Sequence, residues 1–239
     1  MSMRLFLAGV ILALSLAGAC LAEIHWDYLM LTQQWAGTLC SFKECHTKPE
    51  DEDFTIHGLW PSIWPAEEPT ECPVAPKFNE SQLKPILRKL RRYWPDMLSD
   101  SDPDQFWKHE WYKHGRCAIE DKIIVNEFGY FNTTLFLKAQ APVFQALNDS
   151  GIIPDDNAKI LREDIISAIK KHLGVRPVLS CFKKRRKPAK LLEIRVCFSP
   201  ELAPIDCYSR ENTDILGDFQ HGTVNAAPCP RELIFPSFN

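Results

Sequence analysis

The spacing of apolar positions along the chain changes from strand-like to helical and back to strand-like. The aromatic and apolar run from Trp26 to Trp35 predicts a buried strand, and Phe54 to His57 predicts a short strand that stops at Gly58. Helical spacing follows over 83–94, 103–114, 130–147 and 160–172, with a break at Pro142 and a stop at Gly174. Strands are expected again at 178–182, 191–198, near Cys207 and at 233–235. This order predicts an α+β fold with an antiparallel-rich central sheet flanked by helices.

The second of these helices, which should end at Gly115, carries a dense set of titratable groups. Glu110 and His114 are four residues apart and share one face of the predicted helix. His109 and Lys113 have the same spacing and form a neighbouring row. A base, a carboxylate, a second imidazole and an ammonium group would thus line one side of a short helix.

A zinc centre is one chemistry that this helix could hold. Zinc proteases place two histidines four positions apart on one helix face. Here the second histidine, His114, is five positions after His109, and Lys113 occupies the position that would complete the motif. Because an ammonium group cannot bind zinc, the pattern disfavours a metal site, and we expect no metal or other cofactor.

Acid–base catalysis suits these residues better. His114 with Glu110 one turn earlier matches an imidazole that a carboxylate orients and keeps basic. His57, at the predicted end of a strand, could supply a second imidazole, and two imidazoles can cleave RNA without a metal. One removes the proton from the 2′-OH and the other protonates the departing 5′-oxygen, while Lys113 and His109 could stabilise the developing charge. The competing interpretation is a set of solvated charges on a helix surface.

The N-terminus indicates an exported protein. Residues 1–22 combine a charged start, a short apolar run and small residues, which predicts a cleaved signal peptide and leaves 23–239 as a single catalytic domain. No later run is long and apolar enough to predict a membrane span. We therefore expect a protein that enters the secretory pathway.

Cysteine and asparagine motifs fit that compartment. The chain has nine cysteines, and the eight outside the signal peptide predict disulfides, although spacing alone leaves the pairing open. Sequons at Asn79, Asn132 and Asn148 predict N-glycans on surface loops.

Charge limits how the protein could bind a polyanion. The formal net charge is −3, which is unusual for a protein that coats nucleic acid, so RNA would have to meet a local patch. The densest basic run, 183–187, lies between two predicted strands and is interpreted as a solvated hairpin loop. A polyanion-binding patch or a site of proteolytic nicking are the alternatives for this run.

Two segments together resemble the active-site segments of the ribonuclease T2 family. The first is HGLWP at 57–61 and the second is FWKHEWYKHGRC at 106–117. Their order, their separation of about fifty residues and the flanking cysteines also agree with the family. Gln34-Trp35 and Phe235-Pro236 resemble the first and last strands of the family, so that the likeness covers essentially the whole mature chain.

The resemblance implies a secreted or lysosomal endoribonuclease that needs no metal and acts in RNA catabolism. Such an enzyme cleaves single-stranded RNA by transphosphorylation through a 2′,3′-cyclic phosphate, with low base specificity. DNA should resist it because DNA lacks the 2′-OH nucleophile. RNA would be its partner, and we expect a monomer that does not bind membranes. A secreted binding protein on the same fold is the rival, which the complete set of polar site residues disfavours.

The resemblance also implies roles for individual residues. By position His114 would be the general base and His57 the general acid, and the two roles could be exchanged. Glu110 and Lys113 would stabilise the phosphorane, and His109 would bind phosphate.

Trp60 and Gln34 would contact the substrate, with Trp60 stacking on a base. Many relatives carry an acidic residue at the position of Ser62, so base preference is open. The disulfides implied by the family are Cys40–Cys45, Cys72–Cys117, Cys181–Cys229 and Cys197–Cys207.

Overall fold

The computed structural model describes residues 25–65, 69–72, 76–99, 104–119, 123–207 and 226–238. The predicted signal peptide, 1–22, and Pro103 lie outside the described residues. No helix in these ranges is long and apolar enough to cross a membrane.

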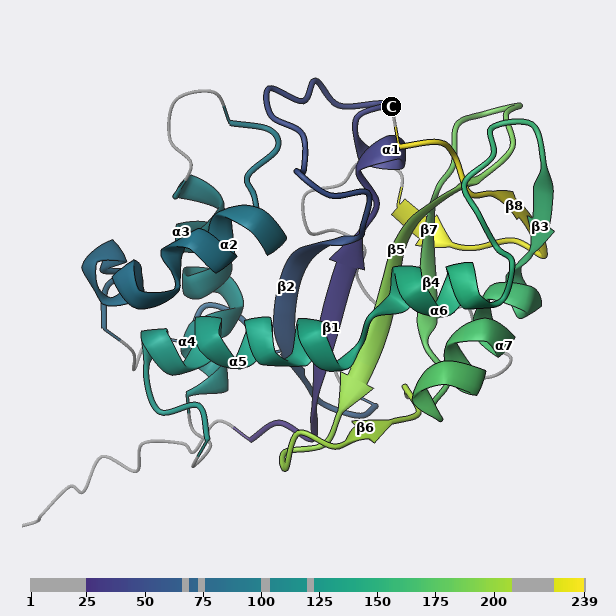
Figure 1. The fold of residues 1–239 in the computed structure, drawn as a ribbon. Helices are drawn as coiled ribbons and strands as arrows, with labels where there is room; N and C mark the ends of the chain where they lie inside the picture. The colour runs from purple at the N-terminus through teal and green to yellow at the C-terminus, as the bar shows by residue number, and fades with distance from the viewer. Residues whose placement is uncertain are drawn as a thin grey trace, which may run out of the picture.

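The described chain begins and ends with strands, and most of its helical segments lie between β2 and β3 (Figure 1). The strands are β1 (Tyr28–Gln34), β2 (Thr55–Ser62), β3 (Lys159–Leu161), β4 (Val178–Phe182), β5 (Lys190–Phe198), β6 (Pro204–Ile205), β7 (Ala226–Pro228) and β8 (Glu232–Ile234). The α-helices are α1 (Ala36–Leu39), α2 (Leu87–Tyr93), α3 (Gln105–Glu110), α4 (Arg116–Ala118), α5 (Glu127–Gln140), α6 (Val143–Asp149) and α7 (Arg162–Leu173). A 3₁₀ segment, η1 (Glu80–Ile86), precedes α2, and a π-helical turn, η2 (Trp111–Gly115), joins α3 to α4.

The central sheet is antiparallel along its main path. Its order is β2-β1-β5-β4-β7, and each neighbouring pair in that path is antiparallel. The described parallel pairing is the short contact of β8 with β5, at Ile234 and Lys190. The predicted α+β fold with an antiparallel-rich sheet is therefore confirmed.

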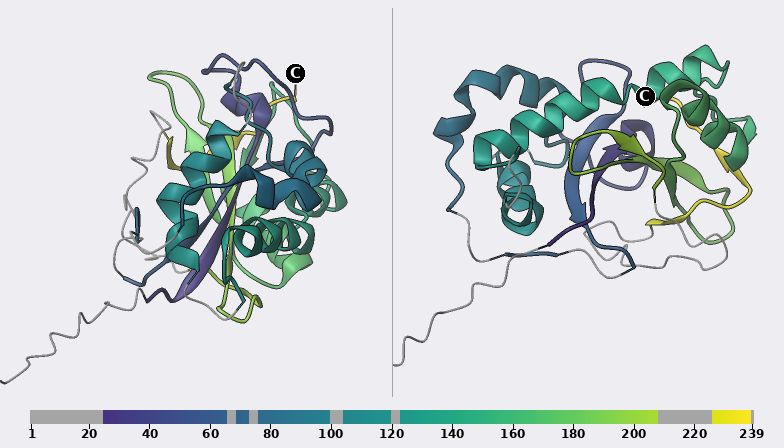
Figure 2. Two further views of the ribbon diagram at one scale, coloured as in Figure 1. Left: turned by 90° about the vertical axis from the view of Figure 1, so that its left-hand side faces the viewer. Right: turned by 90° about the horizontal axis from the view of Figure 1, so that it is seen from below.

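The long helices cover one face of this sheet. In Figures 1 and 2, α5, α6 and α7 lie together against the strands, whereas α3 and α4 lie beside the β2 edge. Leu29 and Leu31 of β1 belong to the large core under these helices, and Met30 packs on the opposite face with Trp60. Alternation along the strand thus separates a helix-covered apolar face from a second face.

The second face carries a row of polar side chains. Gln34 of β1 is paired with Glu193 of β5, and Thr32 is paired with Arg195. All four side chains are on the same side of the sheet, because residues directly opposite each other in a ladder share a face.

Strand β2 is longer than predicted. It continues through Gly58 and Pro61 to Ser62, so His57 lies inside the strand and not at its end. Proline is tolerated because β2 is the outer strand of the main path, where a missing N–H breaks no ladder bond. The pairing with β1 shifts between Thr32 and Gln33, and His57 is the extra residue of the resulting bulge.

The helix predicted over 103–114 is also different in detail. α3 ends at Glu110, the chain then makes the π-helical turn, and helical structure continues in α4 past Gly115. Gly115 has a helical φ of −58° and is no stop signal. A Cβ at that position would lie 2.5 Å from Trp111 and 2.9 Å from Tyr130, so close packing explains the glycine.

The other predicted elements agree more closely with the structure. Pro142 separates α5 from α6, and Gly174, with φ +80°, ends α7, both as predicted. The predicted 83–94 helix begins as the 3₁₀ segment that contains Pro85, whose ring nitrogen cannot donate a backbone bond. The predicted 160–172 helix begins at Arg162, and the residues before it form β3. β7 had no predicted counterpart.

The structure forms four disulfides, with the pairing that the family resemblance implied. They are Cys40–Cys45, Cys72–Cys117, Cys181–Cys229 and Cys197–Cys207. Cys72–Cys117 joins the loop after β2 to α4, so it ties the two motif segments together.

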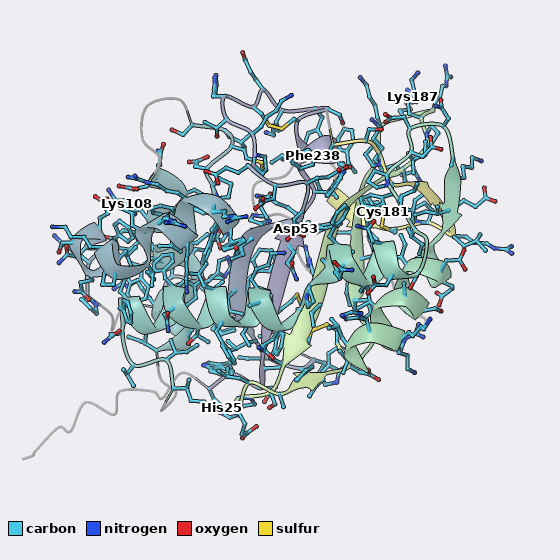
Figure 3. The ribbon with its side chains drawn as sticks, in the orientation of Figure 1. His25, Asp53, Lys108, Cys181, Lys187 and Phe238 are labelled. Atoms are coloured by element: carbon cyan, nitrogen blue, oxygen red, sulfur yellow. A yellow bond between two sulfur atoms is a disulfide. The ribbon has the colours of Figure 1, made fainter. Side chains whose placement is uncertain are left out.

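The basic run 183–187 forms the exposed turn between β4 and β5, as predicted. Lys187, in this turn, projects from the opposite side of the molecule to Lys108 of α3 (Figure 3).

Replacing Cys72 and Cys117 together by alanine should lower the free energy of unfolding by about 2–4 kcal/mol, because the bridge closes a long loop in the unfolded chain. Urea denaturation measures the loss. The matched control is the Cys40→Ala, Cys45→Ala pair, which should lose less because that bridge spans 5 residues and not 45. Equal losses for the two pairs would contradict the loop-length argument.

Candidate active site

The outer strand β2 is held in place by side chains from two helical segments. Trp94, which follows α2, donates from Nε1 to the carbonyl of His57 at 3.0 Å. Tyr130 of α5 donates from its hydroxyl to the carbonyl of Leu59, also at 3.0 Å. These bonds fix the backbone on both sides of Gly58, in the first motif segment.

Trp94 also connects β2 to the second motif segment. The carbonyl of Trp94 accepts a 2.7 Å hydrogen bond from Nε1 of Trp107 in α3. Further along, the N–H of Glu71 donates to the carbonyl of Lys113 at 3.0 Å, next to the Cys72–Cys117 bridge. Two segments that are distant in sequence are therefore joined at both ends of the α3–η2 region.

A buried hydrogen bond joins the two motif segments at their centre. Nε1 of Trp60 donates to Oε2 of Glu110 at 3.0 Å, and the two residues are only 4% and 2% exposed. Gly58 lies directly beneath this bond, and a Cβ there would overlap both Glu110 Oε2 and Trp60 Nε1. The glycine of the HGLWP segment is thus required by the contact between the segments.

Both predicted catalytic histidines lie next to the Trp60 ring. The ring centroids of His57 and His114 are each 5.2 Å from that of Trp60. His114 is 1% exposed, and the His57 side chain is 13% exposed. The structure therefore brings His57, Glu110 and His114 together around one indole.

A buried carboxylate that the sequence reasoning missed holds His57. Nδ1 of His57 is 2.7 Å from Oε1 of Glu193 in β5, whose side chain is 2% exposed. Burial acts to lower the pKa of His57, but the hydrogen bond and negative charge of Glu193 outweigh burial, and Glu110 adds to them. The pKa of His57 is therefore raised above its ordinary value of 6.5.

Arg195 completes this arrangement from the same strand. Its Nη2 donates to Oε2 of Glu193 at 2.8 Å, and its guanidinium carbon lies 5.0 Å from the centre of the Trp60 ring. Burial acts to raise the pKa of Glu193, but Arg195 and then His57 outweigh it and lower the pKa to about 2. Glu193 is a carboxylate under all ordinary conditions.

The sequence did contain a signal for this pair. Glu193 and Arg195 are two charged residues at alternate positions in a strand that is otherwise mostly apolar. Alternate positions face the same side of a sheet, so the two charges had to share one face.

His109 and Lys113 lie at the outer side of the site. His109 is exposed and Lys113 is half-buried. Partial desolvation by neighbouring atoms lowers the pKa of His109, and the positive charges of Lys113 and His57 lower it further. His109 is exposed whereas His114 is buried, so the two histidines face different surroundings. Within the described ranges, no group of three or more His, Cys, Asp or Glu side chains could hold a metal ion.

The remaining predicted residues are placed as follows. Gln34 is 5% exposed and lies beside Glu193 on the polar face of the sheet. Trp60 is covered by His57, His114 and Arg195, so stacking of a base on its ring would require one of these neighbours to move. Ser62, 1% exposed, donates from its hydroxyl to the carbonyl of Trp60 at 3.2 Å.

The sequon asparagines Asn79, Asn132 and Asn148 are all exposed. Asn79 caps η1, and the other two lie within α5 and α6, so the expectation of loop positions was wrong for these two. An exposed position on a helix surface still leaves room for a glycan, and glycosylation stays a prediction.

Replacing Gly58 by alanine should displace Glu110 from Trp60 and destabilise the fold by about 1–3 kcal/mol, the range for overpacking a filled interior. The displacement should appear as a large shift of the Trp60 indole N–H resonance in a ¹H–¹⁵N NMR spectrum. Gly129→Ala is the matched control, because a Cβ there would come no closer than 3.4 Å to any atom. An unchanged Trp60 resonance in the Gly58 variant would refute the proposed close contact.

Comparison with known proteins agrees with the geometry. The model of the ribonuclease T2 family matches residues 26–207, which include both motif segments. Ribonuclease Oy of Magallana gigas is 32% identical over 214 residues, which are 88% of this chain and 95% of that protein.

Solved structures have the same fold. The structure of RNase NT in complex with 5′-AMP has a TM-score of 0.73 and 26% identity, covering 89% of this chain and 98% of its own. Human RNase T2 has a TM-score of 0.72 and 26% identity, covering 88% and 98%. The chain therefore belongs to the ribonuclease T2 family of endoribonucleases.

Proposed function

We propose that this endoribonuclease cleaves single-stranded RNA by transphosphorylation through a 2′,3′-cyclic phosphate, without a metal ion. The observation that carries the proposal is the placement of His57 and His114 at equal distances from the Trp60 ring, beside the buried Glu110. Two imidazoles on one small site can serve both proton transfers of this reaction.

The chemical step needs one imidazole in each protonation state. Neutral His114 takes the proton of the 2′-OH, and the 2′-oxygen forms a bond to phosphorus. Protonated His57 gives its proton to the 5′-oxygen as the bond from phosphorus to that oxygen breaks. The raised pKa of His57 supports its assignment as the acid. The exchange of the two roles remains the alternative, and water completes the reaction by opening the cyclic phosphate.

The charge of the phosphorane is met from the second motif segment. Lys113 opposes the negative charge, and His109, on the outer side of the site, binds the phosphate. Glu110 supports the phosphorane through its neighbours: as a carboxylate it holds the Trp60 ring by accepting the indole N–H, and its negative charge favours the protonated form of His57.

Substrate choice follows from the reaction. DNA is not cleaved, because the attacking atom is the 2′-oxygen. Trp60 and Gln34 contact the nucleotide once the side chains that cover them have moved aside, and no acidic residue stands at position 62, which supports low base specificity.

The compartment belongs to the same proposal. The signal-peptide pattern in residues 1–22, the glycosylation sequons and the disulfides support a protein that is secreted or lysosomal and that degrades RNA there.

His57→Ala and His114→Ala should each lower kcat on single-stranded RNA by about 10²–10⁴-fold, the usual share of a general acid or base. The assay uses a defined oligonucleotide, and wild-type products should end in a 2′,3′-cyclic phosphate. His172→Ala, an exposed histidine in α7, is the control and should keep full activity. Wild-type activity in either site variant would overturn the assignment, and loss of wild-type activity in a chelator would overturn the metal-free reaction.

The rate should fall as pH rises through the pKa of His57, because only protonated His57 can supply the proton. A raised pKa keeps this form populated above pH 6.5, so the decline should begin later than for an ordinary histidine. On the acid side the rate should fall as the base becomes protonated, so the profile should be bell-shaped with its optimum below the pKa of His57. A pH–kcat/KM profile tests this, and a flat profile from neutral to strongly alkaline pH would contradict the two-histidine reaction.

A further inference from the structure

We propose that Glu193 is a positioning residue for the reaction: it fixes the orientation and tautomer of His57, while Arg195 holds Glu193 in place. This inference rests on the proposed function for its kinetic consequences, but its structural content concerns only the hydrogen bond between β2 and β5.

The geometry leaves one ring nitrogen of His57 for chemistry. Nδ1 is 2.7 Å from Oε1 of Glu193, a short distance that is typical of a charge-assisted hydrogen bond. With Nδ1 committed to the carboxylate, Nε2 is the nitrogen that can face a substrate.

This contact crosses an intervening strand. β1 lies between β2 and β5, and Gln34 of β1 is the residue that pairs with both Thr55 and Glu193. β2 and β5 are separated by two strand spacings, roughly 10 Å, so a side chain of a regular β2 strand would not reach Glu193. The bulge at His57 supplies the re-aimed side chain that closes this gap.

Arg195 restricts the carboxylate on its other side. Its Nη2 is 2.8 Å and its Nε 3.3 Å from Oε2 of Glu193, so the two oxygens serve different partners. The Glu193 and Arg195 side chains are only 2% and 11% exposed. A buried ion pair is weak evidence for stability, so a buried triad that ends on a catalytic histidine is better explained by positioning.

The charges around His57 come from two elements. β5 contributes Glu193 and Arg195, and α3 contributes Glu110 and His109. Glu193 and Glu110 favour protonated His57, whereas Arg195 opposes it. Removing Glu193 or Arg195 should therefore shift the titration of His57 in opposite directions.

The proposed role accounts for both ring protons of His57 during the reaction. Protonated His57 donates Nδ1–H to Glu193 and gives its Nε2 proton to the 5′-oxygen. Neutral His57 then retains the proton on Nδ1, because the Glu193 carboxylate, with a pKa of about 2, does not accept it. Nε2 is left with a lone pair and can take a proton from the water that opens the cyclic phosphate.

The test is an NMR titration of His57 in the full mature chain, which needs no RNA. In Glu193→Gln the midpoint of His57 should fall, and in Arg195→Gln it should rise. Glu232→Gln is the control with the same charge change, because Glu232 is exposed on β8, and it should leave the midpoint unchanged. In the wild-type protein, ¹⁵N shifts should place the proton of neutral His57 on Nδ1.

Kinetics supply the second readout. Glu193→Gln should lower kcat at least about tenfold, the lower end of the effect of removing the partner that orients a functional histidine. It should leave KM nearly unchanged and move the alkaline limb of the pH profile to lower pH. Glu193→Asp, which keeps the charge, should recover part of the rate.

Each result decides a different statement. An unchanged midpoint in a folded Glu193→Gln or Arg195→Gln protein, or a neutral proton on Nε2, would overturn the positioning role. If a variant does not fold, the wild-type tautomer measurement still decides. If the wild-type chain fails to cleave RNA, the proposed function falls, whereas the titration and tautomer results stand by themselves.

Discussion

The site depends on the hydrogen bond between Trp60 and Glu110. It is the contact by which the edge strand of a sheet and a short helix, far apart in sequence, meet inside the protein. The bond forms because Gly58 leaves space beneath it. The indole of Trp60 also provides the surface around which His57 and His114 are arranged, so a displacement of this ring would disturb both proton-transfer groups together.

Other contacts hold the two segments at the separation that this hydrogen bond requires. The two tryptophan bonds through Trp94 act on one side, and the Cys72–Cys117 bridge acts on the other. Hydrogen bonds supply direction over short distances, whereas the disulfide limits how far the segments can separate in any state of the chain.

Much of the fold could be predicted because several elements carry their own boundary signals. Pro142 and Gly174 act within one turn of their own position, so their effects are visible in sequence. The end of the strand after His57 and the role of Gly115 were misinterpreted for the opposite reason. Proline is tolerated in β2 only because that strand is at an edge. Gly115 is required because a Cβ there would overlap Tyr130, which lies in another helix. Neither fact is local.

The residues of the site also fall into those that the sequence could predict and those that it could not. His57, Glu110 and His114 belong to two long motif segments, and a family resemblance could find them. Glu193 and Arg195 could not be assigned, because their role depends on strand order, on the register across β1 and on the bulge that turns His57. A regular strand pattern does not reveal a bulge, since the extra residue leaves the composition of the strand unchanged.

The bonds that hold β2 have a consequence for how molecules of this protein meet each other. An outer strand offers unpaired carbonyls to any extended chain that approaches it, and this is how sheets of separate molecules fuse. Trp94 and Tyr130 already occupy the carbonyls of His57 and Leu59. An incoming strand would have to break these two hydrogen bonds before gaining its own, so the side chains that stabilise the active-site strand also protect it from self-association.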